Sequence, residues 1–143
     1  MAVVKAICIS EKKGTPKMLV DECEFIENFG LAGDAHAGNW HRQVSLLAYE
    51  TIRDFNHKGA DVVDGSFGEN LIIEGIDLVN LPVGTRLKFD VVELEITQIG
   101  KECHVRCGIY YRMGNCIMPT NGVFAKVVTG GKIRIDEVVK YED

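Results

Sequence analysis

Apolar and polar residues alternate along much of the chain, and this pattern predicts a series of short β-strands. The alternation is clearest at residues 91–99, where Val92, Leu94 and Ile96 are separated by polar residues, as in a half-buried strand. Other apolar runs end at glycine, proline or charged residues that favour turns. These runs predict strands at 3–10, 18–25, 43–47, 71–73, 122–128 and 132–139, with one more after the Pro-x-Gly turn at 82–84. The pattern therefore predicts seven or eight short strands.

Residues 48–58 follow the period of a helix instead. Ile52 and Phe55 lie three residues apart and Tyr49 lies one helical step earlier, so the three form an apolar stripe, and Gly59 is a suitable end. The chain shows no βαβ alternation. We predict a mostly β fold, a closed or partly open β-barrel with one or two short helices, because closure removes the exposed edges of short strands.

The composition narrows the class of protein. A chain of 143 residues, 46% hydrophobic and 26% charged, is expected to form one soluble domain over residues 1–143. Its formal charge of -5 argues against general nucleic-acid binding, although a local basic patch can still hold an anionic small molecule. No apolar run approaches the roughly 20 residues of a membrane span, and the N-terminus lacks the features of a signal peptide, so we expect a cytoplasmic protein with no membrane partner.

Residues 99–119 concentrate the reactive chemistry of the chain. Cys103, Cys107 and Cys116 lie there together with His104 and several cations. Nearby positive charge lowers the pKa of a thiol, and thiolates also bind soft metals. We therefore expect at least one functional thiol in this segment, and the residues alone do not select which one.

Two other interpretations of the cysteines stay open. Cys103 and Cys107 could be buried structural thiols, although the charged residues around them suit a core poorly. Cys103, His104, Cys107 and Cys116 could also form a structural zinc site, but their spacing matches no common finger. The five cysteines form an odd number, and a domain of this size needs no bridges, so reduced thiols are expected. Cys8 and Cys23 lie in predicted strands and are interpreted as small buried hydrophobes.

Polar groups gather at the mouths of two predicted strands. Residues 30–42 form a glycine-rich loop that carries Asp34, His36, Trp40 and His41, and loops on a rigid scaffold are where binding groups tend to lie. Trp40 could form a pocket wall, although a core aromatic is the favoured interpretation, and His41 is interpreted as a surface or hydrogen-bonded histidine. Arg42-Gln43 precedes one strand and Glu69-Asn70 another. Arg42 can bind phosphate or carboxylate bidentately. Ordinary solvation of strand ends explains each pair equally well.

Taken together, these motifs resemble the MOSC domain, the molybdenum-cofactor sulfurase C-terminal domain, in its small stand-alone bacterial form. The resemblance covers nearly the whole chain, with the motifs in the same order. It rests on a cysteine after the 94–99 strand and on Gly33-Asp-Ala-His-Ala-Gly38, Arg42-Gln-Val-Ser-Leu-Leu47, Gly65-Ser-Phe-Gly-Glu-Asn-Leu71, Leu81-Pro-Val-Gly-Thr-Arg-Leu87 and Gly122-Val-Phe-Ala-Lys-Val-Val128.

The resemblance implies a barrel like that of the pyruvate-kinase family and a pocket for the molybdenum cofactor, a pterin dithiolene with a phosphate, or its tungsten form. A family cysteine would carry sulfur as a persulfide or bind the metal. Relatives with Pro-Cys match Cys103, and relatives with Arg-Cys match Arg106-Cys107, so both thiols are candidates for the catalytic and metal-binding roles. The expected cofactor-binding residues are Asp34, His36, Arg42, Gln43, Glu69, Asn70, Lys101 and Arg106.

The function that this resemblance implies is delivery of sulfur or matured cofactor to a molybdoenzyme or a cofactor-biosynthesis protein. The family as a whole is also linked to pyridoxal phosphate, but these 143 residues hold no counterpart of the aminotransferase-like domain of full-length sulfurases. Two alternatives stay open: a reductase of N-hydroxylated compounds that uses bound cofactor, and a structural-zinc interaction module.

Overall fold

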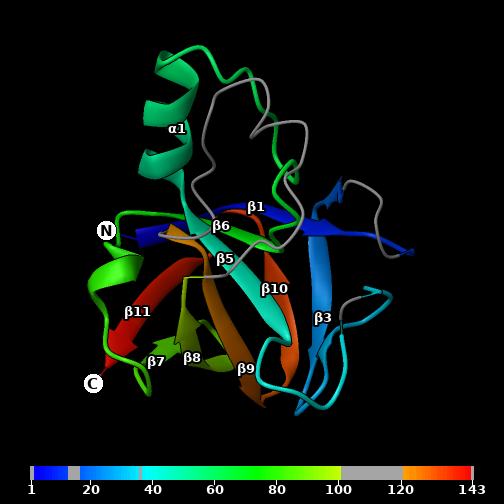
Figure 1. The fold of residues 1–143 in the computed structure, drawn as a ribbon. Helices are drawn as coiled ribbons and strands as arrows, with labels where there is room; N and C mark the ends of the chain where they lie inside the picture. Colours follow the sequence, from blue (N-terminus) through cyan, green and yellow to red (C-terminus); the bar gives the residue numbers. More distant parts are fainter. Residues whose placement is uncertain (1, 13–16, 36, 101–120, 143) are drawn as a thin grey trace.

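The computed structural model describes residues 2–12, 17–35, 37–100 and 121–142 (Figure 1). Within these residues the chain forms eleven strands, one α-helix and one 3₁₀-helix. The strands are β1 (Ala2–Ile9), β2 (Met18–Val20), β3 (Glu22–Ile26), β4 (Gly30–Leu31), β5 (Val44–Ala48), β6 (Leu71–Glu74), β7 (Arg86–Lys88), β8 (Glu93–Ile99), β9 (Val123–Thr129), β10 (Gly131–Arg134) and β11 (Val138–Glu142). The helices are α1 (Tyr49–His57) and η1 (Leu78–Asn80).

Seven of the strands close into a barrel in the order β11-β7-β8-β9-β5-β6-β1. The barrel is closed by antiparallel pairing of β1 with β11, where Ala2 faces Val139 and Val3 faces Val138. Strand β2 adds to the free part of β1, and β10, β3 and β4 form a separate small sheet. The predicted mostly β, closed barrel is confirmed.

Alternation of side chains along the strands produces two apolar clusters. Leu46, Leu71, Leu94 and Ile96 belong to the larger cluster, and each is 0% exposed. Intervening residues such as Leu47 join a second cluster that packs under α1 with Cys8, Ile52, Phe55 and Phe124. The predicted helix is confirmed, with Ile52 and Phe55 buried and Tyr49 packed against the same cluster. No described helix is long and apolar enough to cross a membrane.

The structure corrects four details of the sequence-based prediction. The predicted strand at 18–25 is broken at Asp21 into β2 and β3, and the one at 132–139 is broken into β10 and β11. Gly30–Leu31, which were predicted as the start of a loop, form the short strand β4, so the described residues contain eleven strands instead of seven or eight. Strands β5 and β6 pair in parallel with α1 between them, so one βαβ unit exists where none was expected. Trp40 is 40% exposed and is not a core aromatic.

Candidate functional site

One row of residues runs across the outer face of neighbouring strands and connects the predicted motifs. Leu19 on β2 faces Cys8 on β1, and the Cys8 N–H donates to the carbonyl of Asn70, 2.7 Å away. Asn70 N–H in turn donates to the carbonyl of Ser45 on β5 at 2.7 Å. Ser45 also faces Phe124 on β9, and Phe124 faces Gln98 on β8, where the row ends.

Arg42 lies at the β9 end of this row. Its guanidinium carbon is 4.6 Å from the centre of the Trp40 ring and 5.5 Å from the centre of the Phe124 ring. Its Nε is buried and, in the part of the chain that the structure describes, has no hydrogen-bond partner. The same holds for Oγ of Ser45, whose residue faces Phe124. Two buried polar atoms without partners thus lie beside one aromatic ring, which is unusual because buried polar groups are normally hydrogen-bonded.

A chain of hydrogen bonds connects the glycine-rich loop (residues 30–42) to Gly100, which lies at the start of residues 99–119, here called the cysteine segment. Nε2 of His41 lies 2.8 Å from Oε1 of Gln98, and Nε2 of Gln98 donates to the carbonyl of Gly100 at 2.7 Å. The Thr97 hydroxyl also donates to the His41 carbonyl. Gly100 N–H donates to the carbonyl of Gly122 at 2.6 Å. The residue before position 101 and the residue after Asn121 are therefore neighbours in space. His41 is a hydrogen-bonded surface histidine, as predicted.

Asn70 and Gln43 are buried, and their side chains bind the main chain. Oδ1 of Asn70 accepts from Ser45 N–H at 3.0 Å, and its Nδ2 donates to the Cys8 carbonyl at 3.0 Å. Asn70 therefore holds β1, β5 and the start of β6 in register. Oε1 of Gln43 accepts from Val127 N–H at 2.9 Å. Direct contact of these two side chains with a cofactor stays a prediction.

Asp34 lies toward the β1 and β2 end of the row, in a buried ion pair. Its Oδ1 is 2.6 Å from Nζ of Lys17, and both side chains are almost completely buried, at 0% and 1% exposure. The same oxygen accepts from Ser10 N–H at 3.0 Å. Asp34 thereby ties the glycine-rich loop to the end of β1 and to the residue just before β2.

Glu69 braces the second glycine-rich motif. The residue is 0% exposed, and its two carboxylate oxygens accept from Gly65 N–H and Phe67 N–H, each at 3.0 Å. Desolvation raises the pKa of this carboxyl above its ordinary value, although the main-chain hydrogen bonds act in the opposite direction. Gly65 is packed so closely that a Cβ there would lie 2.4 Å from the carbonyl oxygen of Lys17.

The two described cysteines are unsuited to sulfur transfer. Burial, followed by the negative charges of Glu69 and Asp64, raises the pKa of Cys8 to about 12. Burial is also the main cause of the raised pKa of Cys23. Both thiols therefore stay protonated at neutral pH, and a protonated thiol is a poor nucleophile. Their interpretation as buried hydrophobes is confirmed, since their exposed fractions are 0% and 9%.

The remaining predicted residues lie outside the described ranges. These residues are His36, Lys101, Cys103, Arg106 and Cys107, together with the other two members of the zinc alternative, His104 and Cys116. Within the described ranges, no group of three or more His, Cys, Asp or Glu side chains is placed to hold a metal ion.

Four residues of the site were not predicted from the sequence: Lys17, Ser45, Gln98 and Phe124. Ser45 and Phe124 belong to motifs that carry the family resemblance, which is the signal that could have found them. Gln98 is a polar residue near the end of an alternating strand, and its position resembles that of many solvated residues. Lys17 gave no signal, because a lysine is rarely buried unless it is paired.

The fold and these contacts define a small closed β-barrel protein with an arginine packed against the rings of Trp40 and Phe124 at one end of a row of strands. The MOSC domain family model matches residues 33–140, so the chain belongs to the MOSC domain family, whose members are associated with molybdenum-cofactor binding and sulfurase-like roles. No curated protein matches the sequence.

The solved structures of related fold support the barrel assignment. The YuaD protein from Bacillus subtilis is 18% identical, with a TM-score of 0.81 over 99% of this chain and 96% of YuaD. YiiM from Escherichia coli is 20% identical, with a TM-score of 0.65 over 99% of this chain and 68% of YiiM. YiiM from Geobacillus stearothermophilus is 13% identical, with a TM-score of 0.74 over 100% of this chain and 76% of that protein. At these identities the similarity establishes the fold alone.

Proposed function

We propose that this protein binds the molybdenum cofactor, or its tungsten form, in the cytoplasm. It carries sulfur or matured cofactor on Cys103 or Cys107 to a molybdoenzyme or a cofactor-biosynthesis protein. The observation that carries the proposal is the hydrogen-bond chain from His41 through Gln98 to Gly100. This chain connects the glycine-rich loop, which ends at Arg42, to the start of the cysteine segment. Family membership supplies the class of ligand.

The described residues suit an anionic group at the β9 end of the row. Arg42 supplies a permanent positive charge, and the aromatic rings of Trp40 and Phe124 fix its guanidinium without using its N–H donors. Arg42 Nε and Ser45 Oγ are buried without hydrogen-bond partners among the described residues. A phosphate or other oxyanion offers the acceptors that both atoms need. Arg42 and Ser45 are therefore the residues that would hold the phosphate of the cofactor.

The other predicted pocket residues have a supporting part in this proposal. Gln43 and Asn70 hold the strands on either side of Ser45 through main-chain hydrogen bonds. Asp34 and Glu69 hold the two glycine-rich loops. These contacts keep the face that carries Arg42 rigid before the ligand arrives, which lowers the ordering cost of binding.

The cysteines in the strands and those in the cysteine segment have different parts in this proposal. Since the raised pKa values keep Cys8 and Cys23 protonated, sulfur exchange or metal ligation falls to the cysteine segment. Lys101 and Arg106 are close in sequence to Cys103 and Cys107 and would favour their thiolates. His36 would contact the same ligand from the glycine-rich loop. The bound cofactor would supply the metal and the dithiolene sulfurs on which the transfer depends.

Metal analysis and intact-mass measurement test the proposal. The protein is expressed in cells that make the molybdenum cofactor and is purified without reducing agent. We expect bound molybdenum or tungsten, or the added mass of one sulfur atom on a single thiol. Both signals should disappear in the Cys103→Ser and Cys107→Ser double variant, and the two single variants identify the thiol that is used.

Matched variants separate a loss of chemistry from a loss of fold. Cys23→Ser replaces a described buried thiol whose Sγ lies near main-chain carbonyls and should leave both signals unchanged. Arg42→Met should lower the metal content, whereas Arg53→Met on the exposed face of α1 should not. Metal and sulfur that are absent from the wild type, or that persist in the double cysteine variant, would contradict the proposal.

A further inference from the structure

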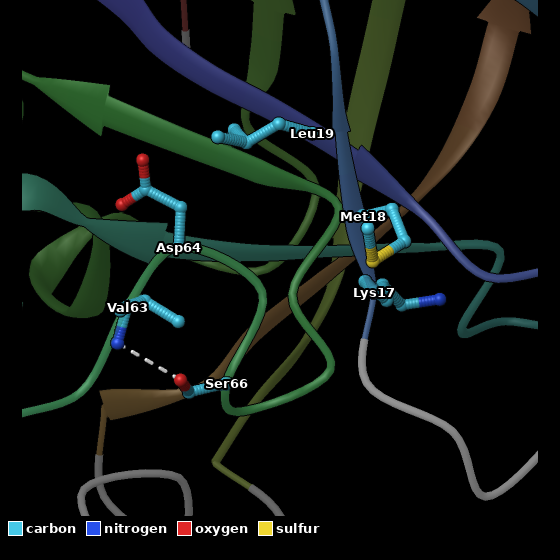
Figure 2. A pocket seen from close by; sticks show the side chains of 6 residues that line it. All are labelled: Lys17, Met18, Leu19, Val63, Asp64 and Ser66. Atoms are coloured by element: carbon cyan, nitrogen blue, oxygen red, sulfur yellow. Dashed lines mark hydrogen bonds between the residues drawn. The ribbon is translucent and has the colours of Figure 1, made fainter.

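The β2 end of the row carries a pocket that the proposed function does not use. It has a volume of about 580 Å³ and is lined by Lys17, Met18, Leu19, Val63, Asp64 and Ser66 (Figure 2). Three apolar side chains at this pocket are exposed to solvent, with exposed fractions of 70% for Met18, 59% for Leu19 and 71% for Val63. Neighbouring exposed apolar side chains around a hollow are typical of an interaction site.

The edge of β2 offers main-chain hydrogen bonds beside this pocket. Cys8 faces Leu19 across the β1–β2 pair, but its N–H and carbonyl are both bonded to Asn70 on the other side of β1. In an antiparallel pair the facing residue then directs its own N–H and carbonyl outward. Leu19 therefore presents one donor and one acceptor at an edge that pairs with no other described strand. Such an edge is a template for an added strand.

The charge of the pocket selects the partner. Figure 2 shows the carboxylate of Asp64 on the side of the pocket where Leu19 lies, whereas the ammonium of Lys17 points away from it. The Lys17 ammonium is instead within 2.6 Å of Asp34, inside the protein. Among the described residues, Asp64 takes part in no ion pair, and it is exposed. The pocket is thus apolar with one uncompensated negative charge, which favours a basic side chain next to aliphatic ones.

The walls of the pocket are fixed in advance. The loop that carries Val63, Asp64 and Ser66 is closed by a hydrogen bond from Val63 N–H to the Ser66 hydroxyl at 2.9 Å. Glu69 binds the next turn through Gly65 N–H, and Gly65 packs on the Lys17 carbonyl. Because the loop is held by buried contacts, a ligand can bind without first ordering it, and this favours affinity.

We propose that the β2 edge is a docking site for an extended segment of a partner protein that carries an arginine or lysine flanked by aliphatic residues. The segment adds a strand at Leu19, its aliphatic side chains contact Met18, Leu19 and Val63, and its basic side chain pairs with Asp64. This site lies at the opposite end of the row from Arg42, so a peptide can be tested there separately from the cofactor.

The probe is a fluorescein-labelled synthetic peptide in which valine and arginine alternate, titrated against the full chain in fluorescence polarisation. Asp64→Asn removes the charge at nearly constant size and should weaken binding by up to about fivefold, the upper end of the range for an exposed ion pair. Leu19→Pro removes the outward N–H and should weaken binding about tenfold. Proline is tolerated at an edge strand whose N–H faces solvent, so this variant should keep the fold.

Matched controls make the assignment specific. Val83→Ser alters an apolar residue that is 63% exposed away from the pocket and should leave the affinity unchanged, whereas Leu19→Ser should lower it. A peptide with N-methylated valines, or with glutamate in place of arginine, should bind more weakly than the probe. Equal affinity for the arginine and glutamate peptides, no effect of Leu19→Pro and Asp64→Asn, or self-association of the protein through β2 in sedimentation would overturn the proposal.

Discussion

The two ends of the row of strands differ in how far their buried polar groups are hydrogen-bonded. At the β1 and β2 end, the carboxylates of Asp34 and Glu69 accept hydrogen bonds from a lysine and from main-chain N–H groups, and they fix two glycine-rich loops. Three of their four oxygens are bonded, and Oδ2 of Asp34 has no partner among the described residues. At the β9 end, Arg42 Nε and Ser45 Oγ are buried without partners among the described residues. Satisfied polar groups stabilise a fold, and unsatisfied ones cost stability unless a ligand completes them. The difference indicates that one end is built for rigidity and the other for binding.

Removal of one member of the buried ion pair should have the largest effect. Asp34→Asn leaves the Lys17 ammonium buried without its counter-charge, and we expect a loss of about 3–5 kcal/mol in the free energy of unfolding. The measurement is urea denaturation of the purified variant. The control is Glu22→Gln, which breaks the exposed pair between Glu22 and Arg134 and should cost less than about 1 kcal/mol. The double variant Asp34→Asn with Lys17→Met should recover part of the loss. Equal effects of the buried and exposed substitutions would contradict the comparison.

The next largest effect is expected where the loop meets Lys17. Gly65 has φ of +90° and would place a Cβ 2.4 Å from the Lys17 carbonyl oxygen, whereas Gly68 has φ of +79° and open space around it. Both Gly→Ala variants suffer backbone strain of about 1–2 kcal/mol, and only Gly65→Ala adds a steric clash of about 1–3 kcal/mol. Thermal denaturation should therefore rank Gly65→Ala below Gly68→Ala. The reverse order would show that the loop is not braced by this contact.

A smaller effect should appear as a dependence on pH. The folded-state pKa of Glu69 is raised by desolvation, so between the ordinary carboxyl pKa and the raised one the folded protein binds more protons than the unfolded chain. Stability from this group therefore falls as pH rises through that window. The free energy of unfolding of the wild type, relative to Glu69→Gln, should decrease from about pH 4.5 upward. A difference that stays constant or increases with pH would show that the main-chain hydrogen bonds outweigh desolvation.

Much of the fold could be predicted because its information is local. Alternation along 91–99 and the apolar stripe of Ile52 and Phe55 identified β8 and α1, since strand and helix periods are properties of neighbouring residues. The breaks at Asp21 and between β10 and β11 were missed, because each interrupts an apolar run for only a few residues. The parallel pairing of β5 and β6 was also missed, because it depends on a long connection that carries no repeated pattern.

The site was harder to predict because its chemistry comes from tertiary contacts. Arg42, Glu69 and Asn70 were selected from their motifs. The structure places Asn70 within the row of strands and Arg42 at its β9 end, whereas the neighbouring Glu69 binds the main chain of Gly65 and Phe67. The partner of Asp34 could not be found, since Lys17 stands in a different segment and only the fold buries the pair. Likewise, the chain from His41 through Gln98 to Gly100 joins residues more than fifty positions apart, which periodicity cannot reveal.

The smallest change in stability, and the sharpest test of the comparison, is expected for Arg42→Met. The variant loses the cation–π contacts with Trp40 and Phe124, but it also removes a buried Nε that has no partner among the described residues. These effects oppose each other, so we expect the free energy of unfolding to change by less than about 1 kcal/mol. Arg42→Lys, which keeps the charge and loses the planar guanidinium, should also fold normally, and Arg53→Met on the exposed face of α1 is the control that should keep its bound metal. If Arg42 serves binding, both Arg42 variants lose bound metal at unchanged stability, as read by urea denaturation and elemental analysis of the same samples. A loss of several kcal/mol in Arg42→Met would instead place this arginine with Asp34 and Glu69, among the residues that hold the barrel together.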